Sequence, residues 1–338
     1  MRFWPSKLST LAGGLALLGL MPKAALADSF IREAGYGVQQ ALNAGMVASL
    51  YALLAVSYAL LHAITNRIVL SFGDIATFGA FYSVYLMLLS IISGTETGLA
   101  LGLVFAAAVA GTAALGIAVN HGVFAPLVKT PSQAIMIASI GLSIALEESM
   151  RLQSSGREQW LAPIYAAPIF RMDFDGYPVS LTVMQAIIFA VSAALIALLY
   201  GVLNRTPAGR LWRACSQNLA LAELCGVDVR LVMTWTAAAA SGFAAVAGWI
   251  IAVAYGGVSF YMGLVLGLKA LFASILGGFG TLGGAIAGGI VLAGLETAWT
   301  AFFPIVYRDV AVFSLVVLVL IVKPDGLLGV SVRRDSEL

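Results

Sequence analysis

Charge is scarce in this sequence. Lysine, arginine, aspartate and glutamate make up only 10% of its 338 residues, whereas about a quarter of an ordinary soluble domain is charged. Apolar residues account for 61%, which excludes a water-soluble globular protein and indicates an integral membrane protein. The formal net charge is only +2, and basic runs with interleaved aromatic residues are lacking, so nucleic acid is not a predicted partner.

Cysteine and histidine are also rare. Cys215 and Cys225 share one polar loop without a histidine nearby, which suggests neither a disulfide framework nor a zinc site and favours two passive thiols. The sequence has no Walker A motif, and no nucleophile is placed with a base at a membrane surface. We therefore predict that the chain is not an enzyme and carries no cofactor or metal.

The apolar residues gather into long runs without the strict alternation of a membrane β-barrel. Each run approaches the roughly 20 helical residues that cross the hydrocarbon core. The predicted fold is all-α, a polytopic transmembrane bundle of about nine spans, with eight to ten possible, in one domain over residues 28–330. The spans are expected near 38–61, 68–93, 98–124, 133–149, 179–203, 231–254, 261–279, 283–303 and 308–322.

Basic residues orient the bundle. The loop over residues 204–230 holds four arginines, and the end of the chain holds Lys323, Arg333 and Arg334. The positive-inside rule places both in the cytoplasm, including a tail over residues 331–338. Counting spans back from the loop puts the segment 150–178 and the mature N-terminus outside.

The N-terminal residues have the order of a secretory signal. Arg2 and Lys7 precede an apolar stretch that ends near Met21, and Ala25-Leu26-Ala27 gives an A-x-A cleavage site. We expect residues 1–27 to be a signal peptide. Because Lys23 is unusual so close to a cleavage site, an uncleaved first helix that adds a tenth span is the alternative.

The stretch "ILGGFGTLGGAIAGGIV", residues 275–291, contains a G-x-G-x-x-G string. In soluble enzymes this string binds a dinucleotide between a strand and a helix, but here apolar spans flank it on both sides. Small residues four positions apart instead allow helix backbones to approach closely in lipid. We predict packing or a hinge, rather than a nucleotide site, at Gly277, Gly278, Gly280, Gly283, Gly284 and Gly288.

Charged side chains inside predicted spans are candidates for function, because they are costly in lipid. These are Asp74, Lys269, Glu296 and Asp309, with Glu147 and Glu148 in a further span. Lys269 and Glu296 lie deepest and are expected to pair inside the bundle. The alternative is that most of these groups snorkel to the interface from helix ends.

The polar loop "GRLWRACSQNLALAELCGVDVR", residues 209–230, has an amphipathic pattern and contains Gly226, a natural helix C-cap. It predicts a short surface helix that docks on another protein, with Ala214 and Ala222 on one face; a solvated linker is the alternative. The candidate contact residues are Gly209, Arg210, Arg213, Ala214, Asn218, Ala222, Glu223 and Gly226.

The spacing of these loop residues resembles the ATPase-contacting motif in the permease subunits of branched-chain amino-acid ABC importers. The resemblance continues through "SLYALLAVSYALLHAI", "LSFGDIATFGAFYSVY", "GLKALFASILGGFGTLGGAIAGGIVLAGLETAW" and "YRDVAVFSLVVLVLIVKPDGLLG", and so covers essentially the whole mature chain. Similar charged residues recur in that family at the positions of Asp74, Lys269, Glu296 and Asp309. Phe72-Gly73 departs from an "NFAHGE"-like segment that is common there.

The resemblance implies a permease in the bacterial inner membrane that works by alternating access. Its partners would be a second permease subunit, two cytoplasmic ATPases, a periplasmic substrate-binding protein and membrane lipid. The expected substrate is a branched-chain amino acid or a related small polar solute, such as urea, a short amide or a small organic acid. A self-sufficient secondary transporter or channel is the alternative function, followed by a membrane enzyme.

Overall fold

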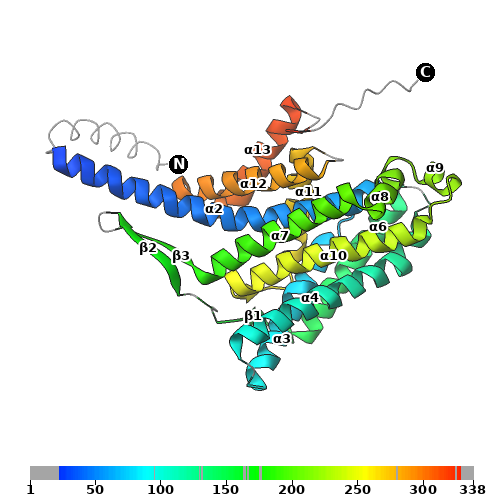
Figure 1. The fold of residues 1–338 in the computed structure, drawn as a ribbon, viewed down its shortest axis with the longest axis horizontal. Helices are drawn as coiled ribbons and strands as arrows, with labels where there is room; N and C mark the ends of the chain where they lie inside the picture. Colours follow the sequence, from blue (N-terminus) through cyan, green and yellow to red (C-terminus); the bar gives the residue numbers. More distant parts are fainter. Residues whose placement is uncertain are drawn as a thin grey trace, which may run out of the picture.

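The computed structural model describes residues 23–94, 96–128, 130, 132–162, 165, 167–174, 177–278, 281–323 and 326–328. The expected signal peptide up to residue 22, Gly280 and the tail 331–338 lie outside these residues. Within the described parts the chain is an α-helical bundle with two short pairs of strands (Figure 1). The predicted fold class, a polytopic helical membrane protein, is confirmed.

In the part of the chain that the structure describes, nine helices coincide with the nine predicted spans. In chain order they are α2 (Lys23–Thr65), α3 (Phe72–Ile92), α4 (Thr97–Val119), α6 (Ser132–Gln153), α7 (Val183–Arg205), α10 (Val229–Ala254), α11 (Met262–Gly277), α12 (Leu282–Phe302) and α13 (Arg308–Val322). A π-helical turn η1 (Asn120–Phe124) and α5 (Ala125–Leu127) extend α4, and a 3-10 turn η2 (Ile305–Tyr307) precedes α13.

Seven helical segments in the described residues are long and apolar enough to cross a membrane. The two other predicted spans coincide with α11, which has only 16 residues, and with α6, which carries Glu147, Glu148 and Arg151. The count of nine spans therefore stays a prediction.

Helix α2 forms the centre of the bundle and packs against α7, α10, α11 and α12. It has 43 residues and is about 65 Å long at 1.5 Å per residue, roughly twice the thickness of the hydrocarbon core. Helices α3 and α10 also lie close together: a Cβ atom added at Gly248 on α10 would lie 2.2 Å from the Ala76 carbonyl oxygen on α3. Missing side chains thus bring helix backbones together in this core.

The segment between α6 and α7 contains structure that the sequence did not predict. Strand β2 (Pro168–Phe174) pairs antiparallel with β3 (Tyr177–Thr182), and β1 (Gln159–Trp160) pairs antiparallel with β4 (Gly257–Val258). Because residues 179–182 belong to β3, the helix starts a few residues after the predicted start of this span near residue 179. Helix α7 begins at Val183 with a capping box formed by Thr182 and Gln185.

The two ends of the bundle differ. The β2–β3 hairpin precedes α7 and packs on α2, where the Ser180 backbone N–H donates to Gln39 Oε1 at 3.0 Å. At the other end of α7 lie two short helices, α8 (Pro207–Gln217) and α9 (Leu219–Leu224) (Figure 1). The hairpin and the α8–α9 element therefore mark opposite ends of the bundle.

Candidate functional site

The deepest predicted charges meet inside the bundle. Lys269 on α11 is 5% exposed and Glu296 on α12 is 6% exposed. The Lys269 Nζ lies 3.0 Å from Glu296 Oε1 and 3.1 Å from Oε2. The pairing expected from the sequence is confirmed, and each charge has the partner that a buried ion requires.

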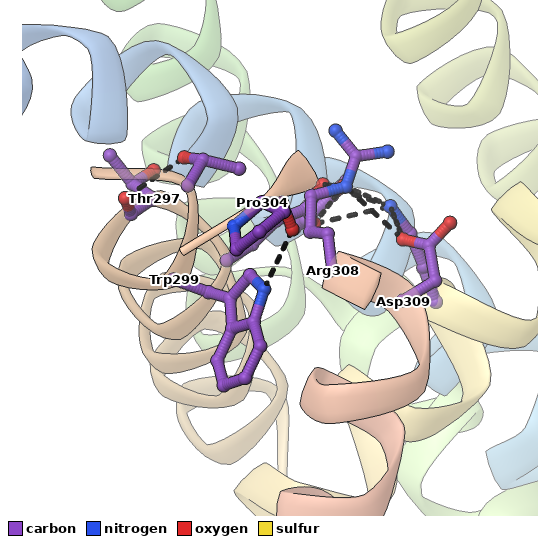
Figure 2. Close-up of polar contacts among 9 residues, drawn as sticks. Thr297, Trp299, Pro304, Arg308 and Asp309 are labelled. Atoms are coloured by element: carbon purple, nitrogen blue, oxygen red, sulfur yellow. Dashed lines mark hydrogen bonds and ion pairs between the residues drawn. The ribbon is translucent and has the colours of Figure 1, made fainter. Parts of the chain in front are cut away.

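Three further residues complete this cluster. Asp309 Oδ1 lies 3.2 Å from Lys269 Nζ, and Arg308 Nε lies 3.0 Å from Glu296 Oε1. The Tyr51 hydroxyl on α2 donates to Glu296 Oε2 at 2.5 Å and accepts from Lys269 Nζ at 2.9 Å. Figure 2 shows Arg308 and Asp309 at the start of α13, beside Pro304, whose carbonyl accepts from Trp299 Nε1 at 3.3 Å.

The cluster is balanced in charge. Its two cations, Lys269 and Arg308, face two carboxylates, Glu296 and Asp309. Tyr51 supplies a neutral hydroxyl that bridges the buried pair, so four helices, α2, α11, α12 and α13, are joined at one point. Sequence reasoning missed Arg308 because an arginine at the edge of a span is typical of a side chain that reaches the interface.

Asp74 lies apart from this cluster. It is 1% exposed in the first turn of α3, and its Oδ2 accepts from the Ser143 hydroxyl on α6. Among the described residues, no lysine or arginine forms an ion pair with it.

Two helix N-termini compensate for the missing cation at Asp74. A Cβ atom at Gly263, in the first turn of α11, would lie 2.0 Å from Asp74 Oδ1. The carboxylate therefore faces the N-terminal turns of both α3 and α11, whose partial positive charge favours an anion. This gives Asp74 a structural account, and its role in transport stays a prediction.

The glycine stretch forms a seam between α11 and α12. A Cβ atom at Gly277 would lie 1.8 Å from the Gly284 carbonyl oxygen, and one at Gly288 would lie 1.9 Å from the Ala273 carbonyl oxygen. Gly277, Gly284 and Gly288 thus lie where the backbones of α11 and α12 approach closely, as the expected packing role requires.

The remaining glycines of the stretch differ from these three. Gly278 ends α11 at a φ of 109°, which only glycine adopts readily. Gly283 makes no such close approach, because this exposed residue has nothing within 4 Å of an added Cβ, and a hinge there stays a prediction. Gly283 lies in the first turn of α12, one position before the seam.

The loop over residues 204–230 folds as two helices rather than one. Thr206 caps α8 and Asn218 caps α9, each through a side-chain oxygen that accepts a backbone N–H. Gly226 follows α9 at a φ of 83°, as a helix C-cap requires. An Arg213 guanidinium N–H donates to the Leu203 carbonyl and fixes α8 against the end of α7.

The break at Asn218 overturns the expectation that Ala214 and Ala222 share one face. Ala214 is exposed on α8, whereas Ala222 on α9 is 4% exposed and packs with Ile64, Cys215 and Met233. The amphipathic pattern was real, but its apolar side at Ala222 faces this chain's own bundle.

The outward surface of the α8–α9 element includes three predicted contact residues, Arg210, Ala214 and Glu223, which are exposed. It also includes two residues that the sequence did not single out, Leu221 and Leu224, which are 59% and 83% exposed. Both leucines lie on α9, and exposed apolar side chains that gather on one surface are typical of a protein contact.

Comparisons with known proteins agree with this architecture. The family model of the branched-chain amino acid transport system permease component matches residues 40–322. The high-affinity branched-chain amino acid transport system permease protein LivH of Escherichia coli (strain K12) is 30% identical over 295 residues, 87% of this chain and 96% of LivH. The corresponding protein BraD of Pseudomonas aeruginosa is 29% identical over 293 residues, 86% of this chain and 95% of BraD.

An archaeal protein is similar over a shorter stretch. The probable branched-chain amino acid transport permease protein LivH of Methanocaldococcus jannaschii is 26% identical over 226 residues, 63% of this chain and 70% of that protein. The matched region 40–322 includes every helix from α3 to α13 and most of α2. The chain belongs to the family of permease components of branched-chain amino acid transport systems.

Proposed function

We propose that this chain is the membrane-spanning subunit of an ATP-driven importer for branched-chain amino acids or a related small polar solute. A second permease subunit, two cytoplasmic ATPases and a substrate-binding protein outside the membrane complete the assembly. ATP-driven closure of the ATPases moves the α8–α9 element, and the bundle then alternates between two accessible states. LivH of Escherichia coli and BraD of Pseudomonas aeruginosa are permease proteins of high-affinity branched-chain amino acid transport systems, which supports the substrate class.

The α8–α9 element is the observation that carries this proposal. It is a capped pair of helices, anchored by Arg213 at the end of α7 and by Ala222 in an apolar cluster with residues of α2 and α10. Its outer face presents Arg210, Ala214 and Leu224. A rigid element of this kind transmits force from a separate motor to the spans, which a channel or a secondary transporter does not need.

Replacement of Ala214 by arginine should release the ATPase and abolish ATP-dependent uptake of leucine, because a long charged side chain would occupy the outer face of α8. The bundle should stay folded, since Ala214 is exposed. Co-purification of the ATPase from membranes and leucine uptake by energised vesicles measure the two effects. Wild-type values for both would mean that the ATPase binds elsewhere or that the chain transports without one.

The variant Ala222→Arg serves as a contrast. Because Ala222 is enclosed by Ile64 and Met233, an arginine there should lower the thermal unfolding temperature as well as ATPase binding, whereas Ala214→Arg should leave the unfolding temperature unchanged. Equal unfolding temperatures for the two variants would contradict the assignment of inner and outer faces.

The orientation of the chain is also proposed here: the α8–α9 element and the C-terminus in the cytoplasm, with the N-terminus outside after removal of residues 1–27. The native thiols provide a test. Cys225 is exposed, whereas Cys215 is buried and burial raises the pKa of its thiol. A membrane-impermeant maleimide should therefore label one cysteine, Cys225, in inverted membrane vesicles and none in intact cells. Labelling of Cys225 from outside the cell would reverse the topology.

A further inference from the structure

Two polar cavities lie behind α8. The larger, about 620 Å³, is bounded by the C-terminal ends of α2 and α7, by α8 and by the start of α12. The second, about 430 Å³, lies between the end of α2 and the α8–α9 corner. The two share Ala63, Asn66, Ser216 and Gln217 as lining residues, so they meet under α8.

The lining of these cavities is positively charged. Arg213 borders the larger cavity and Arg67 the smaller one, and no aspartate or glutamate is among the described residues that line either. Arg67 and Arg213 thus give the lining two cations without a carboxylate to balance them, which suits an anionic ligand rich in acceptor atoms.

An apolar groove adjoins the larger cavity. It has a volume of about 240 Å³ and runs between α2, α7, α8 and α10, with Leu199, Leu231 and Trp235 in its wall. Leu203 and Trp212 border both the groove and the larger cavity. Trp235 is 70% exposed and Leu231 is 54% exposed, so the groove opens on the outer surface of the bundle.

We propose that this combined site binds an anionic phospholipid. The phosphate lies in the polar cavities, near Arg67 and Arg213, and one acyl chain lies in the apolar groove. A phosphate supplies acceptor oxygens for both arginines, and basic pockets between spans at a membrane surface suit anionic headgroups. A bound lipid would thereby join α8 to the ends of α2 and α7.

The test uses the full chain extracted with its surrounding lipid into polymer discs. Native mass spectrometry should detect retained phosphatidylglycerol in wild type and in the control Arg230→Gln, an exposed arginine of the same loop. In Arg67→Gln/Arg213→Gln the affinity for phosphatidylglycerol should fall about fivefold for each arginine removed. Arg67→Lys/Arg213→Lys, which keeps both charges, should restore most of the retention.

A second measurement separates the sources of phosphate. After delipidation, phosphatidylglycerol should raise the thermal unfolding temperature more than phosphatidylcholine or inorganic phosphate does. An equal rise with inorganic phosphate would mean that the site binds a free anion. An equal rise with phosphatidylcholine would mean that the negative charge of the lipid does not matter. Either result overturns the proposal of an anionic lipid. The single variant Arg67→Gln leaves the Arg213 hydrogen bond to Leu203 in place. Undiminished lipid retention in this variant would overturn the proposal as well.

These measurements require neither an ATPase nor transport. The lipid proposal can therefore fail while the proposed import function stands, and the reverse also holds.

Discussion

Replacement of Lys269 by methionine is expected to lower the free energy of unfolding by about 3–5 kcal/mol. The variant keeps the buried carboxylate of Glu296 and that of Asp309, but Arg308 is then the one cation of the cluster that balances them. The double variant Lys269→Met/Glu296→Gln should lose less than either single variant. In the double variant the remaining charges are those of Arg308 and Asp309. They balance each other, and the Arg308 Nε and Asp309 Oδ1 atoms lie 3.3 Å apart. Unfolding in mixed micelles, followed by circular dichroism, measures these changes.

The exposed pair Arg151 and Glu148 provides the control. These side chains are 45% and 47% exposed on α6, so neutralising Arg151 should leave the free energy of unfolding unchanged within error. If the loss in the Lys269 and Glu296 double variant equalled the sum of the single losses, the two residues would be acting independently. The idea of one balanced cluster would then be wrong.

Replacement of Gly288 by alanine is expected to destabilise the bundle by about 3 kcal/mol or more, at the upper end of what overpacking costs. The added Cβ would lie 1.9 Å from the Ala273 carbonyl oxygen and 2.6 Å from the Gly277 nitrogen. Both are backbone atoms, so a side-chain rotation cannot relieve the clash, and α11 and α12 must separate. Thermal unfolding and leucine uptake should both show the loss.

Gly294 on the same helix is the matched control. It is exposed and an added Cβ there meets nothing within 4 Å, so Gly294→Ala should be neutral or slightly stabilising, since alanine favours helix over glycine. Similar effects of the two substitutions would show that helix propensity, rather than the seam, governs this stretch.

Apolar length and charge scarcity were sufficient to predict the helices. Lys269 and Glu296 could be paired from the sequence because each stands near the middle of an apolar run, where an ion without a partner is unstable. The seam was predictable as a region, but the contacts of Gly284 and the open position of Gly283 depend on how α12 is rotated about its axis. That rotation is set by tertiary packing and leaves no mark in the glycine spacing.

Other features could not be read from local patterns. Arg308 joins the cluster because the turn η2 returns α13 toward α11 and α12, a geometry that depends on residues around Pro304. The β2–β3 hairpin is stabilised by contact with α2, more than a hundred residues earlier in the chain. Ala222 looked like part of a docking face because an amphipathic pattern does not say whether its apolar side meets another protein or the rest of the same chain.

The order of the clustered charges along the chain has a consequence for biosynthesis. Lys269 and Glu296 emerge from the ribosome on consecutive helices, so α11 and α12 can enter the membrane as a helical hairpin whose charges already neutralise each other. Each would otherwise cost about 2.5–3.5 kcal/mol to insert alone. Arg308 and Asp309, adjacent in sequence, arrive last and bring a second neutral pair. At no stage of synthesis does the nascent protein have to place a net charge from this cluster in lipid.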